Sequence, residues 1–377
     1  MTMNRRNLML GAASAAGLGG LAFPVFANTP QVIKFGQSAS LTGGQAEYGK
    51  NVRDGILAAF AAASRADNGN GPRFELLTMD DGGVKDRCAK NVVTLIDSGV
   101  SAVVGLTSGA GAEACMQVVQ ESQVPLIGTA SGNMGIRQAK TQPVFNVRAG
   151  YDLEYRRMVN YAKDFGMSRL GVVYLKDTSK ANMDALTQSL AQLSVAPKES
   201  IGVDRNDKSF DTVADALLAA KLDCVLFATN SAPAAAIIDR MMASRYAGLF
   251  YASSFGGQSL LDTLIERKQS CIMSAVVPRP SASRVSVVSR CAQDLAAIGA
   301  ESKMGITTLE GYIAGRTAVE AVRSAMGRGG LGKGRFKESL AGLRADLGGY
   351  KIDFAGTMQG SQYVDLIAID RFGRLVG

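Results

Sequence analysis

The sequence predicts an α/β protein with two lobes, each a mainly parallel sheet covered by helices on both faces. From Val32 onward, short β-forming runs alternate with helical stretches, and this alternation is typical of parallel sheets with crossover helices. The same rhythm starts again after Phe145, so a second sheet is expected. A length of 377 residues suits two domains.

The first lobe is expected to contain four strands with helices between them. The run Val32 to Gly36 ends in the Gly-containing loop 40–44, and the run 74–79 ends in the turn sequence Asp80 to Gly83. The expected elements are, in order, a strand at 32–36, a helix at 48–65, a strand at 74–79, a helix at 85–98, a strand at 102–105, a helix from 109 and a strand at 125–128.

The second lobe is expected to repeat the pattern. Its elements are, in order, a helix at 153–165, a strand at 170–174, a helix at 182–193, a strand near 200–202, a helix at 210–220, a strand at 225–228, a helix at 232–244 and a strand at 249–252. A long helix at 309–326 and a β-rich stretch at 350–369 then return to both lobes. We therefore expect lobe 1 to comprise residues 28–147 with about 279–349, and lobe 2 to comprise 148–278 with about 350–377.

Residues 1–27 are typical of an export signal peptide. Arg5 and Arg6 precede a mildly apolar stretch rich in Ala and Gly, which ends in Val25-Phe26-Ala27, a suitable cleavage site. The paired arginines and the low hydrophobicity favour the twin-arginine route, with a Sec signal as the alternative. Asn28 follows the expected cut, where a lipoprotein needs Cys. The mature protein is thus expected to be free in the periplasm.

Composition excludes several functional classes. The chain has no histidine, which removes the Ser-His-Asp triad, the Cys-His pair and the His metal ligand. The net charge is +8, but Lys and Arg are scattered among acidic residues and form no basic stripe, so no nucleic-acid partner is expected. No Cys spacing resembles a metal site.

Five cysteines lie in a chain that is expected to reach an oxidising compartment. Cys88 and Cys115 fall on consecutive expected helices, and Cys271 and Cys291 bracket a short segment. Both pairs are candidates for disulfides, with Cys224 left as a buried thiol, but the sequence does not fix the pairing.

Loops rich in Ser, Thr, Asn and Gly follow the expected strands. In open α/β sheets, ligands bind beyond the carboxyl ends of the strands. The helix that starts at Gly109 offers free N–H groups to a carboxylate. These loops suit a small polar ligand, although each residue taken alone also fits a helix cap or a turn. The loops are 40–44, 107–111, 129–133, 176–180, 229–232 and 253–257.

Three motifs suggest other chemistry but match it poorly. Residues 109–114 fit G-x-G-x-x-A, yet follow the third strand of the lobe rather than the first. Residues 327–333 resemble a phosphate-binding loop, but Gly334 stands where Ser or Thr is needed. Asp80 and Asp81 point apart on a strand end, so we interpret one of them as a cap of the next helix. We therefore expect no cofactor and no enzymatic reaction.

The chain resembles the type I periplasmic binding proteins of the leucine/isoleucine/valine-binding family, which serve ATP-driven importers. The matching pieces keep their order over nearly the whole mature chain. They are Ser40-Leu41-Thr42-Gly43 with Tyr48-Gly49, Asp80-Asp81-Gly82, Val124-Pro125-Leu126-Ile127, Phe145-Asn146-Val147-Arg148-Ala149, Leu309-Glu310-Gly311-Tyr312-Ile313-Ala314-Gly315-Arg316 and Gly360-Ser361-Gln362-Tyr363-Val364-Asp365-Leu366. The resemblance implies two Rossmann-like lobes, joined by three crossovers, that close over a ligand.

The resemblance also implies ligand-binding residues. Tyr48 lines the pocket near the ligand's side chain, Ser108 and Gly109 bind its carboxylate, and Ala130, Ser131 and Gly132 form the loop for the carboxylate and the ammonium. The family has Thr at the position of Gly132. Ser254 stands where the family places the acid that holds an ammonium, and Ser179 stands where the second lobe contributes an aromatic. Asn230 and Phe255 are expected to substitute in part.

The expected function is therefore the capture of a branched-chain amino acid or another small carboxylate-bearing ligand for the membrane permease of an ABC importer. A monomer suits this role. The departures at 179 and 254 favour a ligand with a carboxylate and no ammonium. The alternatives are an exported sensor that presents its ligand to a membrane receptor, and an exported enzyme, which the missing histidine disfavours.

Overall fold

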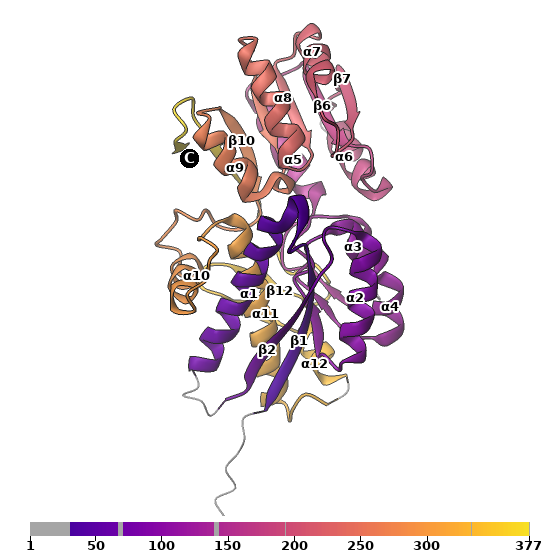
Figure 1. Cartoon of the computed structure of the whole chain (residues 1–377), viewed down its shortest axis with the longest axis vertical. Helices are drawn as coiled ribbons and strands as arrows, with labels where there is room; N and C mark the ends of the chain where they lie inside the picture. Colours follow the sequence, from indigo (N-terminus) through magenta and orange to yellow (C-terminus); the bar gives the residue numbers. More distant parts are fainter. Residues whose placement is uncertain (1–30, 67–70, 139–142, 193, 333, 377) are drawn as a thin grey trace, which may run out of the picture.

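The computed structural model describes residues 31–66, 71–138, 143–192, 194–332 and 334–376. Two lobes lie one above the other along the long axis, and the chain passes between them (Figure 1). The expected signal peptide at 1–27 lies outside the described residues. In the described part of the chain, no helix has both the length and the apolar character needed to cross a membrane.

Lobe 1 contains a five-stranded, wholly parallel sheet in the order β2-β1-β3-β4-β5. In Figure 1 the long helices α1 and α11 lie on one side of this sheet and α2, α3 and α4 on the other. Its elements are β1 (Val32–Ala39), η1 (Gly43–Gln45), α1 (Ala46–Ala66), β2 (Arg73–Asp80), α2 (Lys85–Asp97), β3 (Ala102–Val104), α3 (Gly109–Ala114), α4 (Met116–Ser122), β4 (Leu126–Ile127), η2 (Gly135–Arg137), β5 (Val144–Phe145), α10 (Ser286–Ala297), α11 (Ile306–Gly327) and α12 (Arg335–Ala341).

Lobe 2 contains a seven-stranded sheet in the order β14-β13-β10-β9-β8-β6-β7. The sheet is parallel except for β13 and β14, the last two strands at one edge. Its elements are α5 (Tyr151–Asp164), β6 (Leu170–Leu175), α6 (Lys180–Gln192), β7 (Glu199–Val203), α7 (Asp211–Ala219), β8 (Cys224–Ala228), α8 (Ser231–Ala243), β9 (Leu249–Ala252), η3 (Ser254–Gly256), α9 (Gly257–Glu266), β10 (Cys271–Ala275), β13 (Asp365–Ile369) and β14 (Leu375–Val376).

The expected fold class is confirmed: both sheets are built from alternating strands and helices. The helix expected from Gly109 differs, because α3 ends at Ala114 and α4 begins at Met116. Four further elements, α9 (Gly257–Glu266), β10 (Cys271–Ala275), α10 (Ser286–Ala297) and α12 (Arg335–Ala341), were not predicted. The lobe boundaries at 147, 279 and 350 remain predictions.

Three passages connect the lobes: β5 to α5, β10 to α10, and the hairpin β11 (Arg344–Asp346) and β12 (Lys351–Asp353) to β13. Tyr350 ties two of them together, because its buried hydroxyl lies 2.9 Å from the carbonyl oxygen of Val147 and 3.1 Å from that of Val276. The first and third passages are also joined, because the N–H of Asn146, just after β5, donates to the carbonyl of Met358 on the third passage. The passages are thus hydrogen-bonded to one another where they run side by side.

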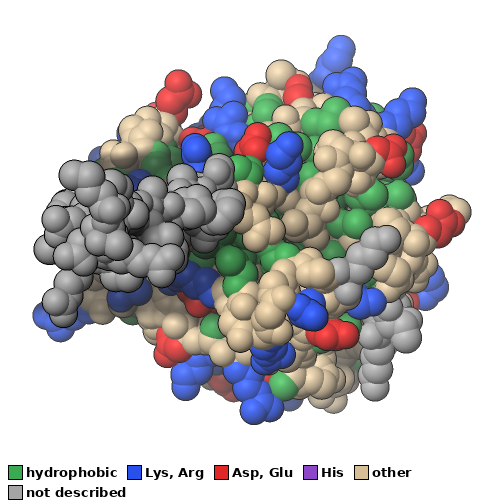
Figure 2. Space-filling model, turned by 90° about the horizontal axis from the view of Figure 1, so that it is seen from below, with side chains coloured by type: hydrophobic (Ala, Val, Ile, Leu, Met, Phe, Trp, Pro, Cys, Tyr) green, Lys and Arg blue, Asp and Glu red, His purple; other side chains and the backbone are tan. Residues whose placement is uncertain are grey.

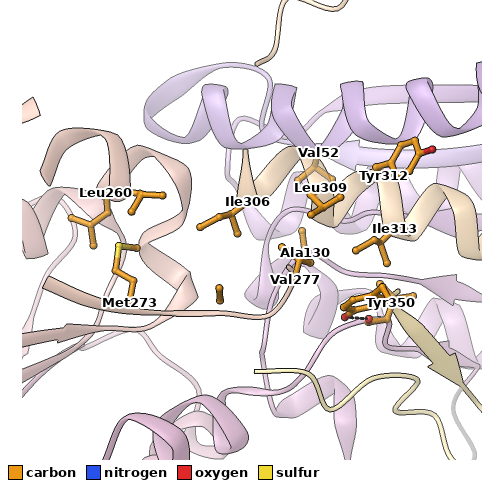
Figure 3. Close-up of a cluster of buried hydrophobic side chains, with 14 of the residues drawn as sticks. Val52, Ala130, Leu260, Met273, Val277, Ile306, Leu309, Tyr312, Ile313 and Tyr350 are labelled. Carbon is orange, nitrogen blue, oxygen red and sulfur yellow. Dashed lines mark hydrogen bonds between the residues drawn. The ribbon is translucent and has the colours of Figure 1, made fainter. Parts of the chain in front are cut away.

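Apolar packing is continuous from one lobe to the other. Figure 3 shows Ile306, at the start of α11, between Leu260 and Met273 of lobe 2 and Val52 and Leu309 of lobe 1. All five side chains are at most 2% exposed. The first turns of α11 therefore serve both lobes, since they bury apolar surface that would otherwise face water.

A buried ion network lies where the first passage enters lobe 2. Arg148 pairs with Glu154 on α5 at 2.5 Å and with Glu310 on α11 at 3.0 Å. Ser254 and Ser274 complete the network by hydrogen bonds to the Glu154 carboxylate. Burial raises the pKa of the Glu310 carboxyl, and Arg148 offsets part of this rise. The Arg148 guanidinium thus connects α11 of lobe 1 to α5 of lobe 2, and Glu154 extends the network to Ser274 on β10.

The surface at the lower end of the molecule carries charges of both signs. Figure 2 shows Lys and Arg interspersed with Asp, Glu and uncharged side chains over this face. Oppositely charged exposed side chains pair elsewhere too, as in Arg169–Asp223 at 2.6 Å. Such exposed pairs contribute little to stability.

The five cysteines are buried free thiols. The Sγ atoms of Cys88 and Cys115 lie 3.9 Å apart, between α2 and the end of α3. The proposed pairing of Cys271 with Cys291 is not formed: Cys271 lies on β10 of the lobe 2 sheet, whereas Cys291 lies on α10, which packs against α1 of lobe 1. Cys224 is buried in β8, as expected.

Refolding in a glutathione redox buffer should join Cys88 to Cys115. Their separation of 27 residues predicts a stabilisation of about 3.5 kcal/mol by restriction of the unfolded chain. Titration with a thiol reagent in denaturant should count three thiols instead of the five of the reduced protein. A Cys115→Ser variant should retain all four of its thiols, and a wild-type count of five after refolding would contradict the pairing.

Replacement of Arg148 by Met should destabilise the protein by about 3–5 kcal/mol, because Glu154 and Glu310 would keep buried, uncompensated charge. The measurement is urea unfolding at neutral pH. Arg169→Met is the matched control: its pair with Asp223 is solvent-exposed, so its loss should change the stability far less than the loss of Arg148 does. Equal effects of the two substitutions would show that the buried network contributes no special stability.

Candidate functional site

A cavity of about 590 Å³ lies between the lobes and is lined by both of them. Its walls are the loops after β1, β2, β3 and β4 of lobe 1 and those after β6 and β7 of lobe 2, with η3 and the starts of α2 and α5. Carboxyl ends of parallel strands meet at these loops, as expected for ligand sites in open α/β sheets. The lining residues are Ser40, Gln45, Tyr48, Gly83, Lys85, Asp86, Thr107, Ser108, Gly109, Ala110, Glu113, Ala114, Ala130, Ser131, Asn133, Tyr151, Leu175, Asp177, Thr178, Ser179, Asn182, Arg205 and Phe255.

Asp80 and Asp81 fix the loop that follows β1. Asp80 Oδ1 accepts from the backbone N–H of Leu41 and of Gly82, and Asp81 accepts from the hydroxyl of Ser40. The hydroxyl of Thr42 also donates to Asp80. The hydrogen bonds to Asp80, that from Thr42 above all, lower the pKa of its carboxyl to about 2. The interpretation of one aspartate as a helix cap is wrong, because the N-cap of α2 is Val84. The carboxylates position a wall of the cavity instead.

Ser108 and Gly109 form the lobe 1 wall where α3 begins. The Ser108 hydroxyl oxygen accepts from the N–H of Gly111 at 3.1 Å and so caps the helix. Its own proton remains available to an acceptor in the cavity. Gly109 has room for no side chain: a Cβ there would lie 2.8 Å from Asn133 and from the Ser131 hydroxyl.

Tyr48 extends from α1 to the cavity and is held there by one strong hydrogen bond. Its hydroxyl donates to the Ala130 carbonyl at 2.6 Å. Its ring lies beside Gly257 of lobe 2, where a Cβ would be 3.2 Å away. Burial raises the pKa of the phenol well above its usual value, so Tyr48 stays neutral. Tyr48 therefore supplies a fixed aromatic surface between the lobes.

Ser131 and Gly132 follow β4, and only Ser131 lines the cavity. A Cβ at Gly132 would lie 2.5 Å from the ring of Tyr151. The ring of Tyr151 thus occupies the space that a threonine side chain would need at this position. The Tyr151 ring also lies 6.1 Å from the ring of Phe255, its neighbour in the cavity wall.

The lobe 2 residues fall into two groups. Ser179 and Phe255 line the cavity. Ser254 does not: it is 3% exposed, and its backbone N–H and hydroxyl both bind the Glu154 carboxylate. Asn230 precedes α8 and also lies outside the lining, with a buried Oδ1 that has no hydrogen-bond partner.

Sequence reasoning missed Tyr151, Glu113 and Asn182 as lining residues. Asn182 Oδ1 accepts from the N–H of Met134 at 2.8 Å and so connects α6 of lobe 2 to lobe 1 beside the cavity. Tyr151 is the first residue of α5, just before the expected helix start at 153. Its aromatic side chain next to the expected crossover was the signal that would have identified it.

The lining offers hydroxyls, amides and backbone N–H groups around three aromatic rings. Within the described ranges, no three His, Cys, Asp or Glu side chains gather in a way that would hold a metal ion. Two charged side chains in the wall, Arg205 and Asp177, neutralise each other by an ion pair at 2.7 Å. Such a lining can bind a small molecule by hydrogen bonds and apolar contact.

Solved structures with the same architecture are numerous but distant in sequence. A possible leucine/isoleucine/valine-binding protein from Rhodopirellula baltica is 24% identical with a TM-score of 0.83, over 93% of this chain and 97% of that one. A substrate-binding periplasmic protein from Ralstonia solanacearum is also 24% identical, with a TM-score of 0.81 over 91% and 99%. An ABC transporter solute-binding protein from R. palustris, in complex with 4-hydroxybenzoate, is 14% identical, with a TM-score of 0.75 over 92% and 95%. At these identities the likeness concerns the fold.

Family membership follows from the sequence itself. No curated protein matches the chain. The family model for periplasmic binding proteins, however, matches residues 32–369, which include every strand of both sheets except β14 and all three passages between the lobes. The residues outside this match are the N-terminal segment and the last eight positions of the sequence. The chain therefore belongs to the periplasmic binding proteins, ligand-binding proteins with the two-lobed type I fold.

Proposed function

We propose that the protein captures a small carboxylate-bearing ligand, such as an amino acid or an organic acid, and delivers it to the permease of an ABC importer. The observation that carries the proposal is the cavity of about 590 Å³ whose wall is shared by the two lobes. A ligand there contacts both lobes only when they are together, so binding favours the closed state by its differential affinity. A permease that recognises closure then receives loaded protein.

The lobe 1 wall offers hydrogen-bond donors to a ligand carboxylate. The Ser108 hydroxyl accepts from Gly111 N–H and donates to no group among the described residues, so its proton can serve a ligand. Ser131 adds a second hydroxyl on the adjacent loop, and Gly109 lets a ligand approach the backbone closely. Charge-assisted hydrogen bonds to a carboxylate are about twice as strong as neutral ones. Tyr48, Ala130 and Phe255 would contact the rest of the ligand, with Ser179 on the lobe 2 side.

Ser254, Asn230 and Gly132 would not contact the ligand directly. Glu154 is the carboxylate nearest to Ser254, and both of its oxygens already accept hydrogen bonds from Arg148, Ser254 and Ser274. It has no acceptor free for a ligand ammonium. We propose that Ser254 acts on the site through this network, and that Gly132 acts by admitting the ring of Tyr151. Asn230 would meet ligand only through a rearrangement at the start of α8.

The paired aromatic rings support aromatic acids as one class of ligand. Tyr151 and Phe255 lie 6.1 Å apart and flank the cavity. The structurally similar protein from R. palustris was solved with 4-hydroxybenzoate. Branched-chain amino acids form the second class, in keeping with the Rhodopirellula baltica structure. Neither class requires a cofactor or catalysis by this chain.

The N-terminal segment completes the proposal. Export by the twin-arginine route, with cleavage after Ala27, would release a soluble monomer into the periplasm. The alternative is a sensor that presents the same ligand to a membrane receptor. Such a sensor would have the same ligand site and the same lobe closure as the importer component. The two differ only in the membrane protein that recognises the closed form.

Thermal unfolding of the mature protein against amino acids, aliphatic acids and aromatic acids tests the proposal. A ligand present at about a thousand times its dissociation constant should stabilise the fold by about 4 kcal/mol. Ser108→Ala should lose most of this shift, because it removes the hydroxyl that faces the cavity. Ser98→Ala is the matched control, since Ser98 is the C-cap of α2, lies outside the cavity lining, and its hydroxyl donates to the Leu95 carbonyl. A protein that none of the acids stabilises would refute a carboxylate-bearing ligand.

A further inference from the structure

Helix α11 of lobe 1 begins without a cap of its own. Its N-cap residue is Gly305, which has no side chain to accept a hydrogen bond from the first turn. N-cap positions favour Ser, Thr, Asp and Asn, because the oxygens of these side chains satisfy N–H groups that a helix leaves free at its start. The N–H of Ile306 is one of these groups, and Ile306 is a buried residue. It therefore needs an acceptor from elsewhere in the protein.

Gln258 of lobe 2 supplies this acceptor. Its Oε1 accepts from the N–H of Ile306 at 2.8 Å. Its own backbone N–H donates to the hydroxyl of Thr307 at 3.4 Å. Gln258 lies in the first turn of α9 and Ile306 is the first residue of α11, so both bonds cross from one lobe to the other. Lobe 2 thus caps a helix of lobe 1.

Residues on both sides of this contact favour it. A Cβ on Gly305 would lie 2.7 Å from Gln258 Oε1, so a side chain that capped α11 locally would displace the amide. Asp262, one turn further along α9, accepts from Gln258 Nε2 at 2.7 Å. Because the amide nitrogen is held by Asp262, the amide oxygen is directed at α11. The missing side chain at 305 and the carboxylate at 262 therefore both promote a cap from lobe 2.

The contact lies where the lobes meet beside the ligand cavity. Phe255, three residues before Gln258, lines the cavity. A Cβ on Gly257 would be 3.2 Å from the ring of Tyr48, so the start of α9 also packs against α1 of lobe 1. The side chain of Ile306 is buried between the lobes (Figure 3). Separation of the lobes would exchange the bond to Gln258 for one to water and would uncover apolar surface.

We propose that Gln258 is a positioning residue that favours the closed arrangement, in which both lobes line the cavity, before any ligand binds. The inference concerns lobe closure, the step on which the proposed function rests, and does not depend on the identity of the ligand. A cap from residue 305 would serve α11 alone, whereas a cap from Gln258 is made only when the lobes meet. Its free energy adds to that of the ligand contacts, so the ligand has less to supply.

The test measures the distance between the lobes in ligand-free protein by single-molecule fluorescence energy transfer. Dyes are attached at Lys90→Cys, on α2, and at Lys208→Cys, between β7 and α7. Both positions are exposed, whereas the native thiols are buried. They follow Lys85 and Arg205, which line the cavity from opposite lobes, so opening should separate the dyes. The wild type should show a closed population.

Gln258→Ala should lower the ratio of closed to open molecules about fivefold, the effect of losing one helix cap. Asp262→Ala should lower this ratio less, because the amide of Gln258 remains but is free to turn. Gln117→Ala is the matched control and should leave the ratio unchanged. The amide of Gln117 also donates to an acid four residues further on, Glu121, but within lobe 1.

A double variant separates positioning of the lobes from stability of the helix. Once Gln258→Ala has removed the amide, residue 305 has room for a side chain, and Gly305→Ser can cap α11 locally. Gln258→Ala/Gly305→Ser should therefore regain the midpoint of urea unfolding that Gln258→Ala loses. Its ratio of closed to open molecules should stay low, because the new cap does not involve lobe 2.

Three outcomes would overturn the inference. They are a ligand-free wild type with no closed population, a ratio that neither Gln258→Ala nor Asp262→Ala changes, and a double variant that regains both the urea midpoint and the closed population. Should Gln258→Ala fail to fold, Asp262→Ala alone decides. No ligand is present in these measurements, so none of their outcomes counts against a carboxylate-bearing ligand.

Discussion

The contact between Arg148 and its two carboxylates is the interaction on which the arrangement of the lobes depends. Arg148 belongs to the first passage, Glu154 to the first turn of α5, and Glu310 to α11. Taking three ions out of water is costly, and only mutual pairing offsets the cost. The pairing exists only when α5 and α11 approach each other. The network therefore specifies how lobe 2 sits on lobe 1, and the cavity between them takes its shape from that geometry.

The same network determines what the cavity presents. Tyr151 lies over the guanidinium, whose Cζ is 5.9 Å from the ring centroid, and the ring faces the cavity on its other side. Tyr151 lines the cavity, whereas Arg148, Glu154 and Glu310 do not. Gly132 is part of this arrangement, since a larger residue would push the ring away.

The alternation of strands and helices was predictable because each element carries its own signal. Runs such as 170–175 and 224–228 are short, apolar and β-branched or aromatic, and they are buried in the sheet. The roles of Ser254 and Gly132 were not predictable. Ser254 binds Glu154, 100 residues earlier, and Gly132 is constrained by a ring from another element. The positions of Tyr48, Ser108 and Ser131 follow strand ends and helix starts, which is why the family pattern located them beside the cavity. Gln258 and Gly305 carry no local signal, since neither residue is unusual until the fold brings them together.

The hydroxyl of Tyr350 imposes a condition on any movement of the lobes. A single proton serves two carbonyl oxygens, at Val147 and Val276, which belong to two separate passages. Sliding one passage along the other by even one residue would break this contact and leave two buried carbonyls without a donor. Twisting about the point where they meet would preserve it. These two hydrogen bonds therefore permit rotation of the lobes about Tyr350 and oppose translation of one passage along the other.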